Sequence, residues 1–494
     1  MAEYLIQDET LTAISNCAKR IVNSEDDMNV GDILEVMSRT QGTVKTSGAY
    51  LAQAFDSNGT VLKSGTYDTG EIFAMPVAPI KEDMTFQGWA CTTPLESDFW
   101  TFVEDSPIDA GAIYAPNDDK FIIQLNITAA NTTMSFDGIH LSVGETIDWG
   151  DGTVESITTT VPSHVYSNVG RYRVKISGYV KATTNAGGND DTYAGYLVPL
   201  DWYNPSTIEK VHLPSYFTKI PKRFFNNMTS LTEVTFSNAV ATVGIACFDG
   251  CTSIECVVLP SSVTEIKSDA SSAYAGLFYG CTNLKKVVLP HGLTELPSGI
   301  FNGCSSLTEN DIVLPKSITN IGSRAFCGCV GLTSIPALPD GVTEISESMF
   351  SGCTGLTNMV IPDSITTIGN SAFYNCKSLT SINIPNGVTS IGSFAFGVSN
   401  ETNNQVTEII VPSSVTYIGR CAFDYRAIKT LILLSEQVCE LDTKISSFSP
   451  SWMVSIYGTS IYVPDALVDS YKADECWGLF GDCIKPLSEY EGVI

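Results

Sequence analysis

The side chains most able to carry chemistry are 15 cysteines and four histidines in a chain of 494 residues. Two groupings, Cys327-Gly328-Cys329 and Cys247 with Cys251 and Cys256, offer the thiolates that zinc prefers, but no Cys-x-x-Cys pair occurs. The histidines lie far apart, and the sequence contains no nucleophile elbow, phosphate-binding loop or dinucleotide fingerprint. The sequence therefore predicts no catalytic residue, no metal ligand and no cofactor, and so a protein that is not an enzyme.

The cysteines instead follow an internal repeat. Six of them recur at steps of 23 to 30 residues, each three residues after a phenylalanine: Cys251, Cys281, Cys304, Cys329, Cys353 and Cys376. Apolar-Pro anchors run from Pro214 to Pro412, with Ser237 replacing one proline, and a phenylalanine follows most anchors by 11 residues. The basic unit is 23 residues, and nine units fill the second half of the chain.

Each unit begins with alternating apolar and polar residues, as in Ser381–Pro385, which predicts a short strand ended by proline. The later Ala-Phe-x-x-Cys-x-x-Leu spacing predicts a helical turn that packs Phe, Cys and Leu inward. No unit can bury these residues alone, so the units are expected to stack into a solenoid. The six cysteines then form a buried thiol ladder. Neighbouring coils are expected to lie about 4.8 Å apart, and this spacing falls within the range of Cα–Cα distances found in disulfides. The cysteine side chains are expected to point in parallel directions, however, which disfavours their oxidation to disulfides.

The repeat closely resembles the BspA-like class of leucine-rich repeats from bacterial surface proteins, of which Ile361–Phe373 is a near-perfect copy. This resemblance implies a solenoid over residues 210–434. It extends to residues 461–488, which are similar to the end cap of such proteins, so residues 435–494 are expected to form a C-terminal cap.

Residues two and four positions before each anchor are expected to point away from the core, because side chains alternate along a strand. The positions selected as a candidate binding face are Lys210, His212, Glu233, Thr235, Lys286, Asp311, Asn358, Asn383 and Glu408. A polar row beside a partly apolar row can bind a ligand. The alternative is a solvated sheet whose scattered valines serve only β propensity.

Two small β domains are expected before the solenoid. Residues 45–116 carry Phe86-Gln87-Gly88-Trp89 and resemble the β-grasp repeat of internalin B. Residues 119–180 carry Asp148–Thr153 and His164-Val165-Tyr166 and resemble a PKD-type immunoglobulin-like sandwich, in which His164 is expected to have a structural role. Asp148 and Asp151 could hold calcium, although a tight turn requires the same residue types. Residues 181–209 are expected to be a linker and N-terminal cap.

Residues 1–42 are expected to be a helical docking segment. Apolar residues at 11, 14, 18 and 21 predict an amphipathic helix capped by Thr10, and a second short helix is expected over residues 30–37. The opening resembles the start of phage and prophage tail proteins, which implies attachment to other tail or virion proteins.

The net charge of −27 disfavours nucleic acid and anionic membranes as partners, and no apolar run is long enough for a membrane helix. The solenoid itself is nearly neutral. The first residues lack the features of a signal peptide, which predicts synthesis in a host cytoplasm. The sequence thus predicts a mainly β, modular, non-enzymatic recognition protein of a phage virion that binds a host-surface glycan or protein. The alternatives are a BspA-like adhesin at the bacterial surface and a carbohydrate-binding accessory of an enzyme system. The sequence does not decide whether the chain forms a homo-oligomer.

Overall fold

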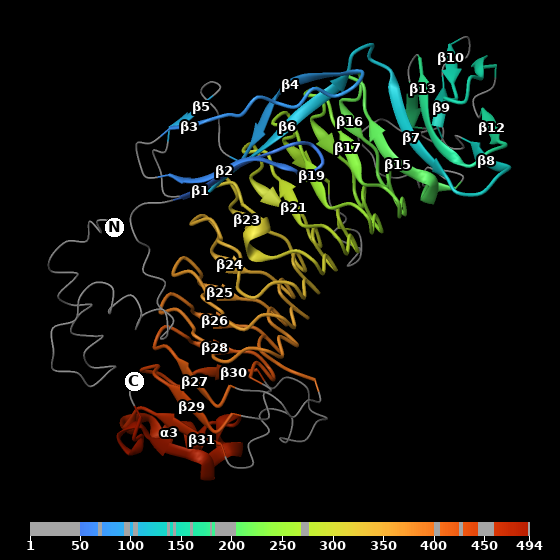
Figure 1. Ribbon diagram of the computed structural model, residues 1–494. Helices are drawn as coiled ribbons and strands as arrows, with labels where there is room; N and C mark the ends of the chain where they lie inside the picture. The colour runs from blue at the N-terminus through green and yellow to red at the C-terminus, as the bar shows by residue number, and fades with distance from the viewer. Residues whose placement is uncertain are drawn as a thin grey trace.

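A computed structural model describes residues 50–67, 72–92, 99–101, 107–135, 139–141, 145–158, 162–177, 180–182, 204–267, 276–399, 406–423, 428–442 and 459–492. The expected helical segment at residues 1–42 lies outside these ranges. The described chain is a long stack of coils with one β module lying along it and another at its N-terminal end (Figure 1). The fold is mainly β, as the repeat pattern predicts.

The module that lies along the stack contains strands β1 to β6. Their bounds are β1 Tyr50–Phe55, β2 Val61–Tyr67, β3 Ile72–Ala74, β4 Met84–Cys91, β5 Phe99–Thr101 and β6 Ile108–Pro116. Four of them form a sheet in the order β2-β1-β6-β4, in which β1 and β6 are parallel, while β3 and β5 form a separate antiparallel pair. Side chains alternate along β6: Ile108, Ala110 and Ala112 face the module's own core. We call this unit the β1–β6 module.

The described residues of the second module form eight strands. Their bounds are β7 Phe121–Ile127, β8 Thr132–Ser135, β9 Ile139–Leu141, β10 Thr146–Asp148, β11 Val154–Ser156, β12 Ser163–Tyr166, β13 Gly170–Ile176 and β14 Val180–Ala182. Its β7 pairs antiparallel with β15 (Ile208–His212), the first strand of the stack, so one sheet continues in the order β11-β10-β13-β7-β15-β17. The module therefore covers the open edge that the stack would otherwise expose.

The coils contribute two rows of parallel strands. The first row contains β15, β17 Glu233–Thr235, β19 Cys256–Val258 and β21 Lys286–Val288, and after single bridges it resumes with β27 Glu408–Val411, β29 Thr430–Leu433, β31 Ser460–Val463 and β32 Ile484–Pro486. The second row consists of two-residue strands: β16 Lys219–Ile220, β18 Thr242–Val243, β20 Glu265–Ile266, β22 Glu295–Leu296, β23 Asn320–Ile321, β24 Glu344–Ile345, β25 Thr367–Ile368, β26 Ser390–Ile391, β28 Tyr417–Ile418 and β30 Glu440–Leu441. The coils thus bond to one another along parts of both rows, and the ladders are interrupted between β17 and β19, between β20 and β22, and between β23 and β24.

The predicted helical turn after the second row is wrong, because each coil makes successive tight turns there. In one coil Ser348 and Gly352 have positive φ values of 55° and 75°, which a helix does not allow. The amide of Phe350, between them, donates to the carbonyl of Ala372 at 2.8 Å, and the Gly352 amide donates to Tyr374 at 2.7 Å. Backbone donors that a helix would use internally therefore bond to the next coil and hold the stack together.

The core contains two regular rows of side chains. Phenylalanine rings stack from coil to coil, with centroids 4.9 to 5.8 Å apart, along Phe225, Phe248, Phe278, Phe301, Phe326, Phe350, Phe373, Phe396 and Phe423. The six repeat cysteines lie beside them, fully buried and outside any disulfide, and each thiol donates to a phenylalanine carbonyl of the preceding coil at 3.0 to 3.2 Å. The thiols therefore satisfy a backbone acceptor inside an apolar core.

The last strands lie against short helices, drawn in red in Figure 1: η4 Asp465–Leu467, α3 Val468–Ala473, η5 Trp477–Cys483 and η6 Leu487–Glu489. Two further short helices, η1 Pro205–Thr207 and η2 Glu309–Asp311, lie earlier in the chain. The Trp477 ring is buried against Tyr471, and its Nε1 donates to the Cys439 carbonyl at 2.7 Å. These contacts close the C-terminal end of the core. Among the described residues, no helix has the length and apolarity needed to span a bilayer.

Candidate binding face of the solenoid

The outward side chains of the first strand row form a continuous surface, which we call the strand face. In β21, Val287 points into the core of the stack, whereas Lys286 and Val288 point outward. The same alternation holds for Glu233 and Thr235 on β17. The spacing from the proline anchors thus selects residues that leave the core, as the period of two requires.

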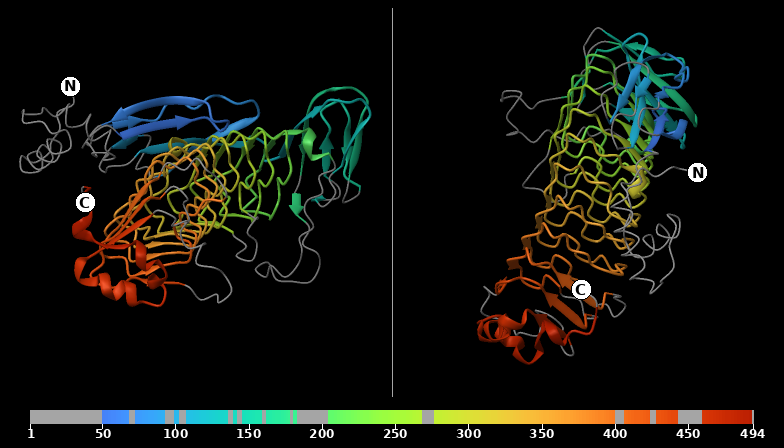
Figure 2. Two further views of the ribbon diagram at one scale, coloured as in Figure 1. Left: turned by 90° about the horizontal axis from the view of Figure 1, so that it is seen from below. Right: turned by 90° about the vertical axis from the view of Figure 1, so that its left-hand side faces the viewer.

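The upstream part of this face is not open to solvent, which corrects the expected binding face. The β1–β6 module covers it, with β6 packed against β17, β19 and β21 (Figures 1 and 2). His212, Glu233, Thr235 and Lys286 are buried and Lys210 is half-buried. The sequence pattern could not show this, because the covering residues belong to another domain more than 100 residues away.

Glu233 is the centre of one polar contact between the module and the face. Its carboxylate accepts from Ser57 Oγ at 2.6 Å and Lys81 Nζ at 2.5 Å on the module side, and from Lys210 Nζ at 2.8 Å on its own side. Burial alone raises the pKa of Glu233, but the charges of Lys81 and Lys210 outweigh it and lower the pKa to about 2. Beside it, burial lowers the pKa of His212 to about 4, so this ring is neutral when it bonds to Thr235 at 2.9 Å.

A second ion pair joins β6 to β21. Lys286 Nζ lies 2.7 Å from Asp109 Oδ2, and the two side chains are only 8% and 2% exposed. Lys286 Nζ also lies 4.7 Å from the centre of the Phe55 ring, a cation–π distance. Burial raises the pKa of Asp109 to about 6, although the charge of Lys286 opposes the shift. Lys286, predicted to meet a ligand, thus meets the chain's own module.

The apolar contact between the two parts is small and tight. Phe55, Ala90 and Ile113 of the module pack with Cys256, Val258 and Val288 of the face. A Cβ atom at Gly111 on β6 would lie 2.3 Å from a methyl carbon of Val258, and one at Gly59 would lie 2.6 Å from Cys256 Cβ. The module therefore approaches the coils so closely that only glycine fits at both positions.

The face becomes open beyond β21. Asp311 is half-buried and is not a free outward carboxylate, because its Oδ2 accepts from the amide and hydroxyl of Thr308 and caps η2. Further along, Asn358, Asn383 and Glu408 are exposed, and Val360 beside them is 42% exposed. These are the predicted face residues that the structure leaves available to a partner.

The open part ends in an aromatic cluster that the sequence reading missed. Tyr490 donates to Glu408 at 2.8 Å, the rings of Tyr490 and Tyr462 lie 5.2 Å apart, and Lys485 Nζ lies 5.8 Å from the Tyr462 ring centre. The same spacing rule applied to Pro464 selects Tyr462, so one of these residues had a detectable signal. Tyr490 had none, because it comes from the end cap.

Two other candidate sites have structural roles. Asp148 accepts from the Gly150 amide and Asp151 from the Thr153 amide, while the second oxygen of Asp151 lies 2.7 Å from His164 Nε2. These bonds build the turn, and the described residues contain no group of three His, Cys, Asp or Glu side chains that could hold a metal. Burial raises the pKa values of the repeat thiols far above the usual range, which disfavours the thiolate form that reacts with electrophiles and metals.

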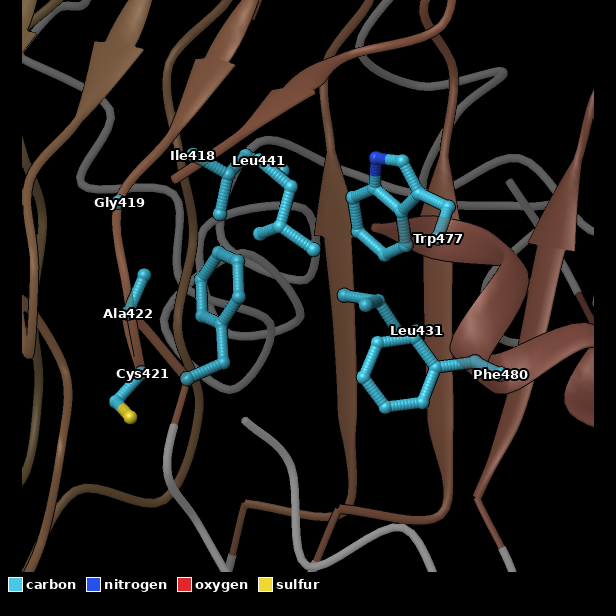
Figure 3. A pocket seen from close by; sticks show the side chains of 9 residues that line it. Ile418, Gly419, Cys421, Ala422, Leu431, Leu441, Trp477 and Phe480 are labelled. Carbon is cyan, nitrogen blue, oxygen red and sulfur yellow. The ribbon is translucent and has the colours of Figure 1, made fainter. Parts of the chain in front are cut away.

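An apolar pocket lies where the phenylalanine row meets the end cap (Figure 3). Its lining includes Phe423, Leu431 and Leu441 of the coils and Trp477 and Phe480 of the end cap. The indole nitrogen, the polar side-chain atom of this lining best suited to orient a ligand, already bonds to Cys439. The pocket therefore reflects the packing of unlike elements and lacks the polar groups of a ligand site.

Comparison with known proteins identifies the repeat. Residues 201–312, 271–402 and 308–429 match the family described as BspA type leucine rich repeat region, in six copies. A leucine-rich repeat protein of T. pallidum is 30% identical over 34% of this chain and 77% of its own, with a TM-score of 0.30. A leucine-rich cell surface protein of Faecalibacterium prausnitzii is 21% identical over 46% and 73% of the chains, with a TM-score of 0.30. One from Eubacterium ventriosum is 17% identical over 64% and 99%, with a TM-score of 0.27. Curated proteins yield no match.

Proposed function

The solenoid of this protein belongs to the BspA-type leucine-rich repeats, and on that premise we propose that the chain is a recognition protein that binds a protein or glycan through the open part of the strand face. The observation that carries this is the exposed row of Asn358, Val360, Asn383 and Glu408 on a stack of hydrogen-bonded coils. Amide and carboxylate groups supply directional hydrogen bonds, and Val360 supplies apolar contact. The stack holds these groups at fixed spacing, so little order is lost on binding.

The proposed setting is a phage or prophage virion that uses this face to contact a host surface. Its support is the resemblance of the opening of the chain, from Tyr4 to Ile14, to the start of phage and prophage tail proteins. A bacterial cell-surface adhesin is the second candidate, favoured by the BspA-type repeats themselves. Mass spectrometry of purified virions separates the two: the chain is expected among the particle proteins. Its absence from virions, together with its recovery from the bacterial envelope, would establish the adhesin.

Binding by the strand face is tested with a matched pair of valines. Val360 on the face and Val330 at a coil corner are each 42% exposed. We expect Val360→Asp to lower retention of the purified chain on intact bacterial cells at least tenfold, and Val330→Asp to leave it unchanged, with equal melting temperatures for both. Treating the cells with protease or with periodate shows whether the receptor is protein or glycan. Equal retention of both variants would refute binding through this face.

A further inference from the structure

The two N-terminal modules are attached to the solenoid in different ways. The β7–β14 module shares a hydrogen-bonded sheet with β15 and β17, and one apolar core runs from Phe121 in β7 to Ile484 in β32. The β1–β6 module has a separate sheet and its own apolar clusters. It meets the coils through side chains and a few loop hydrogen bonds. The β7–β14 module is therefore part of the solenoid, whereas the β1–β6 module is docked on it.

The docked interface has the character of a reversible contact. Among the described residues, six apolar side chains form its core. Its other contacts include the Glu233 cluster, the Asp109–Lys286 pair, and bonds from the amide and side chain of Asn238 to Gln87 at 3.1 and 2.9 Å. The His291 amide also donates to the Cys91 carbonyl at 3.2 Å, and Asp83 pairs with Lys175 of β13 at 2.6 Å. Polar interfaces of this kind are typical of domains that move relative to each other.

The position of β6 shows what this surface accepts. Asp109, Gly111 and Ile113 alternate toward the coils: Asp109 binds Lys286 on β21, and Gly111 lies on Val258 of the preceding strand β19. An extended strand thus crosses the coils, with its carboxylate on a lysine and its glycine on a valine. The row of small apolar side chains continues beyond the module through Val313 and Ala337 to the exposed Val360, so the covered and open parts are one surface.

We propose that the covered part of the strand face is a second recognition surface, for an extended protein strand with a carboxylate two residues before a glycine, and that the β1–β6 module is its displaceable occupant. This inference rests on the proposed function, because it extends the same face upstream. Undocking exposes Thr235, Val258, Lys286 and Val288 and lengthens the surface that a partner can cross. The module then competes with the partner and sets the affinity of the whole face.

Cys256 provides a direct readout in the full chain. Its side chain is outward on β19, 2% exposed, and covered by the module, whereas Cys281 later in the same coil faces the solenoid core at 0% exposure. Labelling with N-ethylmaleimide at pH 7, followed by peptide mass spectrometry, gives a rate for each thiol. Undocking exposes Cys256 alone, and global unfolding exposes both. We expect Cys256 to react at least tenfold faster than Cys281.

The variant Gly111→Leu forces a side chain into the space of Val258 and should raise the Cys256 rate at least tenfold again, with Cys281 unchanged. Gly111→Ala gives a milder second variant. In the Gly111→Leu chain, a synthetic peptide of Ile108–Pro116 should slow Cys256 labelling, and the same peptide with Gly111→Leu should not. Equal rates for Cys256 and Cys281 in every chain would refute displacement, and equal protection by both peptides would refute the strand chemistry. Neither measurement uses a cell or receptor, so their failure is separate from failure of the proposed function.

Discussion

The buried pair between Asp109 and Lys286 makes a sharp prediction about module docking. Asp109→Asn removes the carboxylate and leaves the Lys286 ammonium, 8% exposed, without its ion-pair partner. Breaking a buried pair in this way typically costs about 3–5 kcal/mol. Because the Phe55 ring stays 4.7 Å from the ammonium and offsets part of the loss, we take the lower end, about 3 kcal/mol. That corresponds to a roughly 150-fold weaker docking equilibrium.

Removing the lysine instead, in Lys286→Met, should weaken docking less than Asp109→Asn does. Burial already raises the pKa of Asp109 to about 6 against the opposing charge of Lys286, so in Lys286→Met the carboxyl takes up a proton and becomes neutral at pH 6. The double variant removes both charges, and we expect its docking to lie within about 1 kcal/mol of the original chain. Docking in the original chain, the two single variants and the double variant is measured by the labelling rate of Cys256 relative to that of Cys281. Additive losses in the double variant would refute the ion-pair reasoning.

Two further predictions concern stability. Phe350→Ala deletes a fully buried ring whose centroid lies 5.4 Å from the rings on both sides. Urea denaturation should therefore show a free energy of unfolding that is lower by about 3–5 kcal/mol. A decrease below about 1 kcal/mol would mean that the phenylalanine row is not a source of stability. Glu233 has a folded pKa of about 2, below its ordinary 4.5, so its contribution to stability is complete above pH 4.5 and is lost as the pH falls toward 2. Urea midpoints of the original chain should therefore fall more steeply than those of Glu233→Gln between pH 4.5 and 2.5, and parallel curves would contradict the assigned role of Lys81 and Lys210.

The interior of the solenoid could be read from the sequence because the relevant contacts repeat. Every coil meets a copy of itself, so the environment of Phe350 is also that of Phe373 and Phe326. The turn after the second strand row could not be read in this way. The spacing of three residues between Phe, Cys and Leu suits a helix. The Phe350 amide nevertheless bonds to the next coil, because the stacked neighbour offers a carbonyl at the same height in every repeat.

The binding face shows the same division. Alternation along the strands correctly selects the residues that leave the core, including Glu233, Lys286 and Asn358. Alternation carries no information on what lies above those residues. The structure shows that Lys286 and Glu233 hold the chain's own module, that Asp311 caps a short helix, and that Asn358 is open.

The sequence alone determined the repeat, its period and the inward and outward residues, since these depend on local alternation and on contacts between identical units. Only the tertiary structure decided which outward residues remain available. Asp109 lies 177 residues before Lys286 and outside the repeat, and no periodic pattern connects them. Their pairing depends on how two separately folded sheets fit together, at a point where Gly111 leaves room for Val258.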